Sequence, residues 1–502
     1  MKVLYEKLNE IKNLFIKYKV ILFFIFLFGI ITYGMKLFFY SISIDTEVIM
    51  TSFDGQMRSW YSIGRFGLGI IKWFFNFNPF NPYFANWVMV LIFILSVVLL
   101  AFILESNYKK LSNLKLFIFS LMIISSPILA EQFNFILQGA EIAIAMLLLD
   151  IGFFLFTVYL DSKKIVFGLL AIPFFAISFG CYQAFLPLFI AIVVWIGFLK
   201  NQNGEYKRSK ENIRYIAISI LIFIASYLFS TFLTKLCMSY LSITSTSYLK
   251  EQISWLHSPF KDNVKNLYEY VKNVLLGKGV FYNSFYGISV ILVAFYSIKG
   301  IIQKKLNFYQ IFYLLIILIT PFLMSLLLGS PEPTRAQFVL PYSTAFLVSY
   351  LFIFKKKWVQ IFLGILLCFM IFQQVQTTVH LFFTDYSRYE DDKQLANNVM
   401  NRVNTISESN KVIFVGKHHS TSKTMLLEGD VIGKSFFEWD AGWVIGSNYR
   451  IVGFMNTIGY NLEMPTIEEY NIAVQESKKM QKWPNENSIK KYENFVIVKL
   501  SE

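Results

Sequence analysis

The chain has 502 residues, of which 56% are hydrophobic and only 16% are charged. Soluble domains carry about 25% charged residues, so the composition excludes an ordinary soluble protein and indicates an integral membrane protein. The net charge of +14 does not indicate a nucleic-acid partner. Most Lys and Arg residues lie in short loops between apolar runs, where they orient a membrane protein.

Residues 1–19 are basic, and the apolar run that follows is longer than the core of a signal peptide and has no small-residue cleavage site. This pattern predicts a retained signal anchor. A bilayer core about 30 Å thick needs roughly 20 apolar residues per helix. That length predicts about eleven membrane-spanning helices, although the runs within 165–199 fit a short pair or one broken helix. The segments are expected near 20–40, 87–104, 115–130, 141–160, 165–180, 182–199, 214–238, 285–299, 308–328, 338–354 and 358–378.

Basic residues cluster in alternate loops between these segments. If the basic N-terminus is cytoplasmic, the positive-inside rule puts all of these clusters on the cytoplasmic side. The clusters are Lys109, Lys110 and Lys115; Lys163 and Lys164; Lys200, Lys207, Arg208, Lys210 and Arg214; Lys299, Lys304 and Lys305; and Lys355, Lys356 and Lys357.

The other loops then face outward and hold most of the unusual polar residues. These loops are 41–86, 131–140, 239–284 and 329–337. We therefore expect an all-α multi-pass protein of the cell membrane whose catalytic domain is residues 1–379 and whose chemistry lies outside.

Hydropathy drops from His380 onward, which predicts that residues 380–502 form a small extracytoplasmic α/β domain. Helical spacing occurs in two stretches and short apolar strands in two others. The helices are expected at 391–407 and 466–480, and the strands at 412–415 and 495–500.

The first outward loop, from Ser41 to Arg65, holds three carboxylates and two arginines in an otherwise apolar chain. Charge this close to a membrane is costly and usually functional. A single helix from Glu47 to Arg58 would put Glu47, Asp54 and Arg58 on one face. The alternative is a solvated loop whose charges mark the membrane boundary. The charged residues are Asp45, Glu47, Asp54, Arg58 and Arg65.

Other outward segments hold further candidates. Arg335 could hold a phosphate through paired hydrogen bonds, or it could pair with Glu332. Tyr182 and Gln183, at the break between two apolar runs, could bind sugar hydroxyls or satisfy the broken helix backbone. Another outward turn is bracketed by acidic and amide side chains that could line a cavity or be ordinary loop polarity. These are Glu131, Gln132 and Glu141.

The sequence contains no pattern for a metal or a nucleotide. Its four histidines form no HExxH motif, and its three cysteines lie within or beside apolar runs, so neither a metal site nor a disulfide framework is expected. There is no P-loop, Rossmann glycine pattern or G-x-S-x-G elbow. We expect no cofactor and a donor that is energised elsewhere.

Several short motifs resemble the polytopic Gtr glucosyltransferases of type II. Ser43-Ile44-Asp45-Thr46-Glu47, then Trp60, then Gly64-Arg65-Phe66-Gly67 resemble the family's acidic motif, Trp and Gly-Arg pair. Tyr182-Gln183-Ala184 resembles its Tyr-Gln motif, Arg335-Ala336-Gln337 with Pro341 its late Arg motif, and Trp483-Pro484 with Val496-Ile497-Val498-Lys499-Leu500 its tail. Many relatives have two adjacent aspartates at the acidic motif, so the lead role is open between Asp45 and Glu47.

The resemblance implies a GT-C-like architecture and a polyprenyl-phosphate-linked sugar donor. It also implies a cell-surface glycan as acceptor, on the outer face of the cytoplasmic membrane. Asp45 is then our first candidate for the general base and Glu47 the second. The donor phosphate would lie against Arg65, Arg335 and Arg58. Direct attack by the acceptor would invert the anomeric centre. Candidates for holding sugar or acceptor are Tyr182, Gln183, Asp54, Trp60 and Glu141.

Two other functions also fit the sequence. One is a transporter or flippase of lipid-linked sugars, since broken helices and intramembrane polar groups suit transporters. The other is a polysaccharide polymerase or ligase, which would use a lipid-diphosphate oligosaccharide.

Overall fold

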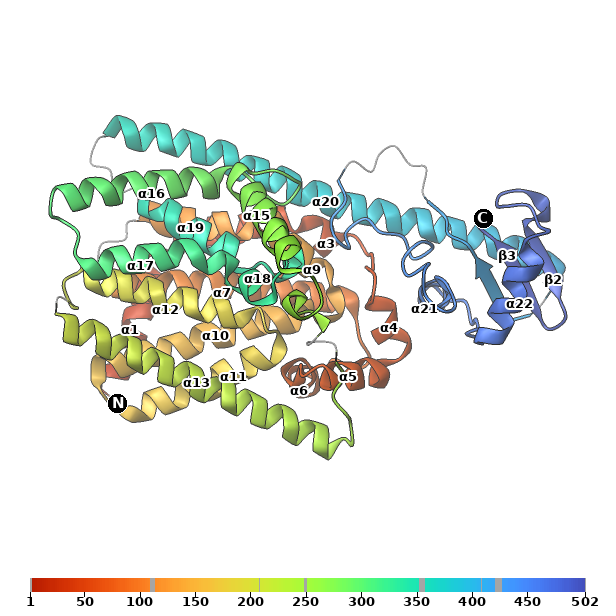
Figure 1. Cartoon of the computed structure of the whole chain (residues 1–502), viewed down its shortest axis with the longest axis horizontal. Coiled ribbons are helices and arrows are strands. Elements are labelled where there is room, and N and C mark those ends of the chain that lie inside the picture. Colours follow the sequence, from red (N-terminus) through yellow and green to blue (C-terminus); the bar gives the residue numbers. More distant parts are fainter. Residues whose placement is uncertain are drawn as a thin grey trace.

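In the computed structural model the chain forms a helical bundle with a smaller lobe beyond one end (Figure 1). The structure describes residues 2–501 apart from 109–112, 207, 248–250, 352–356, 408 and 420–426. Some lysines of the predicted cytoplasmic loops therefore lie outside the described residues. They are Lys109, Lys110, Lys207, Lys355 and Lys356.

The chain begins with a helix that bends sharply before the first apolar segment. α1 (Lys2–Lys17) and the apolar α2 (Lys19–Thr32) meet at 74°, and α3 (Gly34–Phe38) follows. Asp161 joins two basic side chains, because its carboxylate oxygens lie 3.0 Å from Nζ of Lys7 and 3.0 Å from Nζ of Lys200. These ion pairs fix α1 beside two distant turns of the bundle.

The bundle itself consists of apolar helices whose side chains pack against one another. Each predicted apolar segment overlaps one helix or a run of consecutive helices, and two separate helices occupy residues 165–199. Residues 352–354 of the segment predicted at 338–354 lie outside the described residues. The helices are α7 (Pro82–Tyr108), α8 (Asn113–Ile124), α9 (Pro127–Asn134), α10 (Ile136–Ser162), α11 (Ile165–Cys181), α12 (Phe185–Gln202), α13 (Ser209–Tyr240), α16 (Phe285–Ile302), α17 (Phe308–Ile319), η2 (Thr320–Phe322), α18 (Leu323–Leu328), α19 (Val339–Leu351) and α20 (Lys357–Ile406).

Within the described residues, seven helices are long and apolar enough to cross a membrane, or nine if α1–α2 and α8–α9 are each one bent span. α11 and α19 are apolar but shorter. The prediction of a mostly helical, multi-pass membrane protein is therefore confirmed. The number of eleven crossings stays a prediction.

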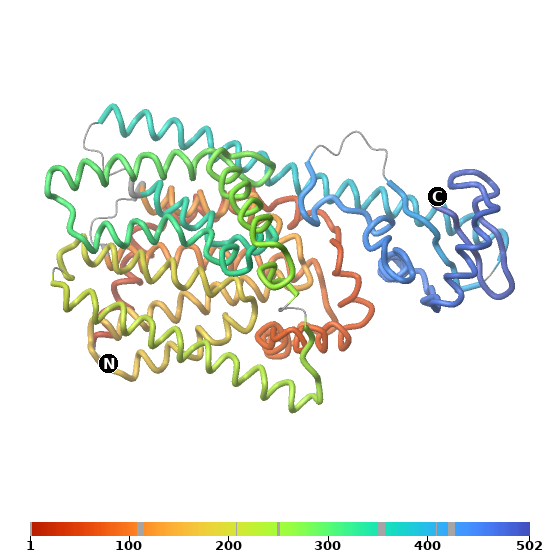
Figure 2. The backbone as a smooth tube through the Cα atoms, viewed as in Figure 1, coloured from red at the N-terminus to blue at the C-terminus, as the bar shows by residue number. Residues whose placement is uncertain are grey.

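The two ends of the bundle differ in the segments they carry. The turns between α10 and α11, α12 and α13, and α16 and α17 lie at the end away from the lobe, as Figures 1 and 2 both show. Shorter helices lie at the end nearest the lobe. They are α4 (Thr46–Thr51), α5 (Phe53–Ser62), α6 (Phe66–Phe74), η1 (Ser254–Leu256), α15 (Phe260–Leu276) and η3 (Thr334–Ala336).

The first outward loop folds differently from our expectation. The chain breaks at Ser52, whose non-helical backbone (φ −145°, ψ 71°) separates α4 from α5. The single helix considered from Glu47 to Arg58 is therefore not formed. Serine is a weak helix former that favours helix ends, which agrees with a break at this position.

The C-terminal lobe, residues 407–501, is reached by one long helix, because α20 continues without interruption past residues 379 and 380. The lobe holds a three-stranded sheet of order β1-β3-β2, with β1 parallel and β2 antiparallel to β3. Both predicted strands and both predicted helices are present, whereas α21 and β2 were not predicted. The elements are β1 (Val412–Val415), α21 (Asn448–Thr457), α22 (Ile467–Ser477), η4 (Glu486–Ser488), β2 (Ile489–Tyr492) and β3 (Phe495–Lys499).

Candidate active site

A cavity of about 370 Å³ lies at the end of the bundle nearest the lobe, where segments far apart in the sequence meet. These are the residue before α4, α5 with the loop that follows it, the α9–α10 junction, the turn between α11 and α12, the stretch before η1, α18 and the segment around η3. Six of the predicted site residues line this one cavity. They are Asp45, Trp60, Arg65, Tyr182, Gln183 and Arg335.

Asp45 stands immediately before α4 with its backbone in the left-handed region (φ 75°). This conformation is uncommon outside glycine, although Asp and Asn adopt it more readily than most residues. Its Oδ1 lies 2.6 Å from Nη1 of Arg450 in α21, while 38% of the Asp45 side chain remains exposed. Arg450 of the lobe thus holds Asp45, while part of the Asp45 side chain still lines the cavity.

Two arginines line the same cavity, and in the described residues neither forms an ion pair. Burial raises the pKa of Glu131, and Arg335 lies near enough to that carboxyl to oppose the rise; Glu332 also lines the cavity. The guanidinium carbon of Arg65 lies 4.7 Å from the ring centre of Tyr182, and that of Arg335 lies 4.8 Å from the ring centre of Phe135. In the part of the chain that the structure describes, neither guanidinium has a carboxylate within 4.0 Å, and the buried Nε of Arg65 has no hydrogen-bond partner. The alternative of an ion pair between Arg335 and Glu332 is thus not observed. Stacking orients a planar guanidinium and leaves its N–H groups available for an anion.

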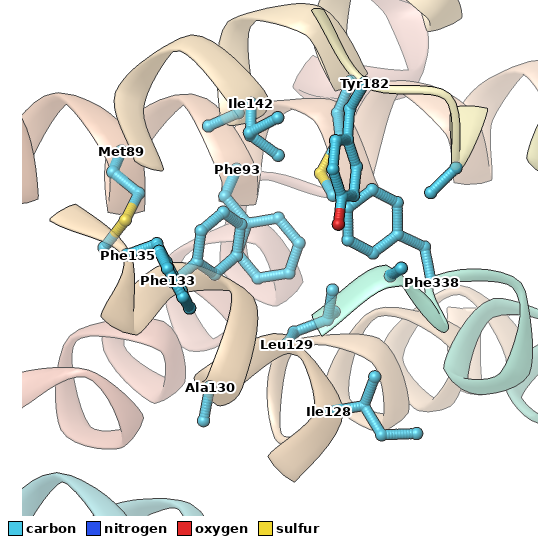
Figure 3. Close-up of a cluster of buried hydrophobic side chains, with 14 of the residues drawn as sticks. Met89, Phe93, Ile128, Leu129, Ala130, Phe133, Phe135, Ile142, Tyr182 and Phe338 are labelled. Carbon is cyan, nitrogen blue, oxygen red and sulfur yellow. The ribbon is translucent and has the colours of Figure 1, made fainter. Parts of the chain in front are cut away.

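The aromatic rings that carry these arginines are anchored in the apolar core beneath the cavity (Figure 3). The ring of Tyr182 packs against Phe338 with centroids 5.7 Å apart. Deeper in the cluster, Phe93 and Phe133 pack edge to face at 4.8 Å. Such packing restricts the rings, so the arginines stacked on them have a rigid support.

Most of the helical bundle matches a known protein family. A family model described as "Glucosyl transferase GtrII" matches residues 34–353, well over half of the chain. The chain belongs to this family. It is therefore a membrane glycosyltransferase. No curated protein matches the chain. The matched region contains all six cavity residues named above and ends before α20, so the C-terminal lobe lies outside it.

Three charged residues of the glycosyltransferase's acidic loop do not line the cavity. Glu47 is buried in α4, and its Oε1 accepts a hydrogen bond from Nη1 of Arg450 at 2.7 Å. Asp54 and Arg58 are exposed on α5. The break at Ser52 separates them from Glu47, because α5 starts in a new direction.

Glu141, predicted to bind sugar or acceptor, forms a buried ion pair with Lys72 instead of reaching the cavity. Its Oε1 lies 2.9 Å from Nζ of Lys72, and both side chains are fully buried. The Lys72 ammonium also lies 5.6 Å from the ring centre of Trp60, which does line the cavity. The ion pair thus supports Trp60, one of the residues that line the cavity of the glycosyltransferase.

Several polar residues at this site were not predicted. Gln56, Ser59, Gln138 and Gln252 line the cavity, as does Glu332, which was considered only as a partner of Arg335. Arg450 reaches Asp45 from the lobe. Only Arg450 left a signal in the sequence. It directly precedes the apolar run from Ile451 to Met455, and a buried arginine needs an anionic partner.

Glu47 makes the stability of the glycosyltransferase depend on pH. Burial raises the pKa of Glu47 to about 8; Arg450 opposes this shift, and the charge of Asp45 adds to it. In the unfolded chain the same group loses its proton near pH 4.5. Between these values the folded state holds a proton that the unfolded state has lost, so stability falls as pH rises from about 4.5 to about 8.

We therefore expect the thermal unfolding midpoint of the detergent-purified protein to fall across this pH range. The unfolding midpoint of Glu47→Gln, whose side chain cannot ionise, should fall less. Glu468→Gln, an exposed change at the start of α22, should behave like the wild type. Equal pH slopes for Glu47→Gln and the wild type would contradict the assignment.

Proposed function

We propose that this glycosyltransferase moves a single sugar from a polyprenyl-phosphate donor to a cell-surface glycan, on the outer face of the cytoplasmic membrane. The observation that carries the proposal is the presence of Asp45, Arg65 and Arg335 around one cavity. A carboxylate that shares a cavity with two arginines, neither of them in an ion pair within the described residues, suits a reaction in which a hydroxyl is deprotonated while a phosphate leaves.

The reaction is an inverting displacement at the anomeric carbon. The acceptor hydroxyl oxygen forms its bond to that carbon as the bond to the phosphate oxygen breaks. Asp45 takes the hydroxyl proton as general base. Arg65 and Arg335 stabilise the charge that develops on the departing polyprenyl phosphate. Trp60, Tyr182 and Gln183 line the same space and hold the sugar.

Asp45 is a better general base here than Glu47. Its side chain is 38% exposed and lines the cavity, whereas that of Glu47 is 1% exposed and lies behind it. No metal or other cofactor is needed in this scheme, because the two arginines supply the positive charge that the leaving phosphate requires.

The proposal includes an orientation of the protein in the membrane. The turns that carry Lys163 and Lys164 and, between α16 and α17, Lys304 and Lys305 lie at the end of the bundle away from the cavity (Figure 1). By the positive-inside rule this end is cytoplasmic. The N-terminus is then cytoplasmic, the chain crosses the membrane eleven times, and the C-terminal lobe is extracytoplasmic.

A donor assay tests the proposal against its rivals. We expect purified protein in lipid nanodiscs to transfer sugar from radiolabelled polyprenyl-phosphate glucose to cell-wall glycan from cells that lack the enzyme. A flippase would move the labelled lipid across a vesicle membrane without transfer, and a polymerase or ligase would use only lipid-diphosphate oligosaccharides. Either of those results, with no transfer from polyprenyl-phosphate glucose, galactose or N-acetylglucosamine, would overturn the proposal.

A further inference from the structure

The C-terminal lobe reaches the acidic motif of the cavity through one buried side chain. Nη1 of Arg450 lies 2.6 Å from Asp45 and 2.7 Å from Glu47, and its Nε lies 2.6 Å from Oδ2 of Asp440. The Arg450 side chain is only 8% exposed. Three carboxylates from two separate parts of the chain therefore converge on one guanidinium.

The lobe also contacts the opposite side of the cavity. Oδ2 of Asp430 accepts a hydrogen bond from the backbone N–H of Thr334 at 2.7 Å, directly before Arg335. The backbone N–H of Val431 donates to Oε1 of Glu131 in α9 at 2.6 Å. The lobe thus fixes the segment that carries Arg335 as well as the segment that carries Asp45.

The contact between α21 and α4 leaves no free space. A Cβ added to Gly453 would lie 2.9 Å from Cγ of Glu47, closer than side-chain carbons pack. A larger residue at position 453 would therefore force Glu47 or α21 to shift, so the glycine favours the close approach that lets Arg450 reach Asp45.

Of the three carboxylates on Arg450, only Asp45 lines the cavity. One of its oxygens is fixed by the guanidinium, and its left-handed backbone restricts it further. A reacting group held in a sparsely populated conformation needs surrounding contacts to keep it there. Arg450 is such a contact, and it comes from outside the region that matches the family model.

We propose that Arg450 is a positioning residue for the transfer reaction: it holds one oxygen of Asp45 so that the other faces the acceptor hydroxyl. The inference rests on the proposed function, because Asp45 must act as the base. It makes the C-terminal lobe a working part of the active site. An enzyme with a misaligned base loses rate in the chemical step, whereas donor binding at Arg65 and Arg335 is retained.

The test compares steady-state kinetics of Arg450 variants in nanodiscs, with polyprenyl-phosphate glucose as donor. Arg450→Gln should lower kcat about 10- to 100-fold, because a misplacement of about 1 Å at the reacting groups can cost roughly 100-fold. The donor KM should change less than about threefold, because the phosphate-binding arginines are intact. Arg450→Lys keeps the charge without the fork of N–H groups and should recover part of the lost kcat.

Arg402→Gln is the matched control, near the end of α20. Arg402 is half-buried, stacks on Trp483 and donates to the backbone oxygens of Pro484 and Asn485, and it does not line the cavity. Its kcat should equal that of the wild type. If Arg450→Gln does not give a monodisperse protein, Arg450→Lys and Gly453→Ala carry the test. Gly453→Ala separates α21 from α4 with every charge kept, and it should reproduce the loss of kcat.

The outcomes separate this inference from the proposed function. Folded Arg450→Gln with wild-type kcat, beside an inactive Asp45→Asn, overturns the positioning role and leaves the transfer reaction standing. A rise in the donor KM of Arg450→Gln as large as the expected fall in kcat, with kcat itself unchanged, also overturns the positioning role. A wild-type protein that transfers no sugar from any polyprenyl-phosphate donor overturns both.

Discussion

Asp45→Asn should abolish sugar transfer, with kcat reduced by at least about 100-fold, the lower range for loss of a general base. Asparagine keeps the size of the side chain, and it tolerates the left-handed backbone of residue 45 (φ 75°). The amide cannot accept the hydroxyl proton, so the loss reports chemistry rather than misfolding. The measurement is transfer from radiolabelled polyprenyl-phosphate glucose, with donor binding followed separately.

A second aspartate provides the control for this experiment. Asp262 is exposed in the first turn of α15, at the same end of the bundle, and does not line the cavity. Asp262→Asn should transfer sugar at the wild-type rate. Full activity of Asp45→Asn would remove Asp45 from the mechanism. If Asp45→Asn is inactive but still binds the donor, its inactivity is not caused by loss of the folded protein.

Arg335→Gln should lower kcat/KM for the donor by about 100- to 1,000-fold, as expected when one donor of charge stabilisation is lost from an active site. The substitution removes the charge and the paired N–H groups, while Phe135, on which the arginine stacks, stays in place. Unlike Asp45→Asn, it should also weaken donor binding, because the phosphate is charged in the ground state. Arg65→Gln should have an effect of the same kind.

Lysine at position 335 distinguishes charge from geometry. It restores the positive charge but cannot form paired, planar hydrogen bonds, so we expect activity between that of Arg335→Gln and the wild type. Arg402→Gln again serves as the unaffected control. A wild-type donor KM and kcat in Arg335→Gln would show that the phosphate does not bind at this arginine.

Hydropathy was sufficient to locate the helices of the bundle, because burial in a bilayer demands long apolar runs whatever their neighbours. It could not predict how the connecting loops fold. Gly55 is the weaker helix former of the two, yet the chain breaks at Ser52, so the position of the break depends on packing against other segments. In the lobe, the capping box at Thr466 and Glu469 marks the start of α22, whereas α21 has no such signal.

The same difference between local and distant information applies to the site. Asp45, Arg65, Tyr182 and Arg335 could be predicted individually, because each is a polar residue beside an apolar run. Glu47 and Arg450 are 403 positions apart, and nothing local to either residue identifies the other as its partner. For Glu141, the sequence showed a carboxylate near an outward turn but not the lysine that neutralises it.

The unbroken course of α20 has a mechanical consequence for the position of the lobe. Its 50 residues span about 75 Å at about 1.5 Å per residue, far more than the roughly 30 Å of a bilayer core. A rigid rod of this length sets both the height of the lobe above the lipid and its direction around the axis. Insertion of one residue turns everything beyond it by about 100°. The register of α20 thus helps to set where Arg450 of the lobe lies relative to Asp45.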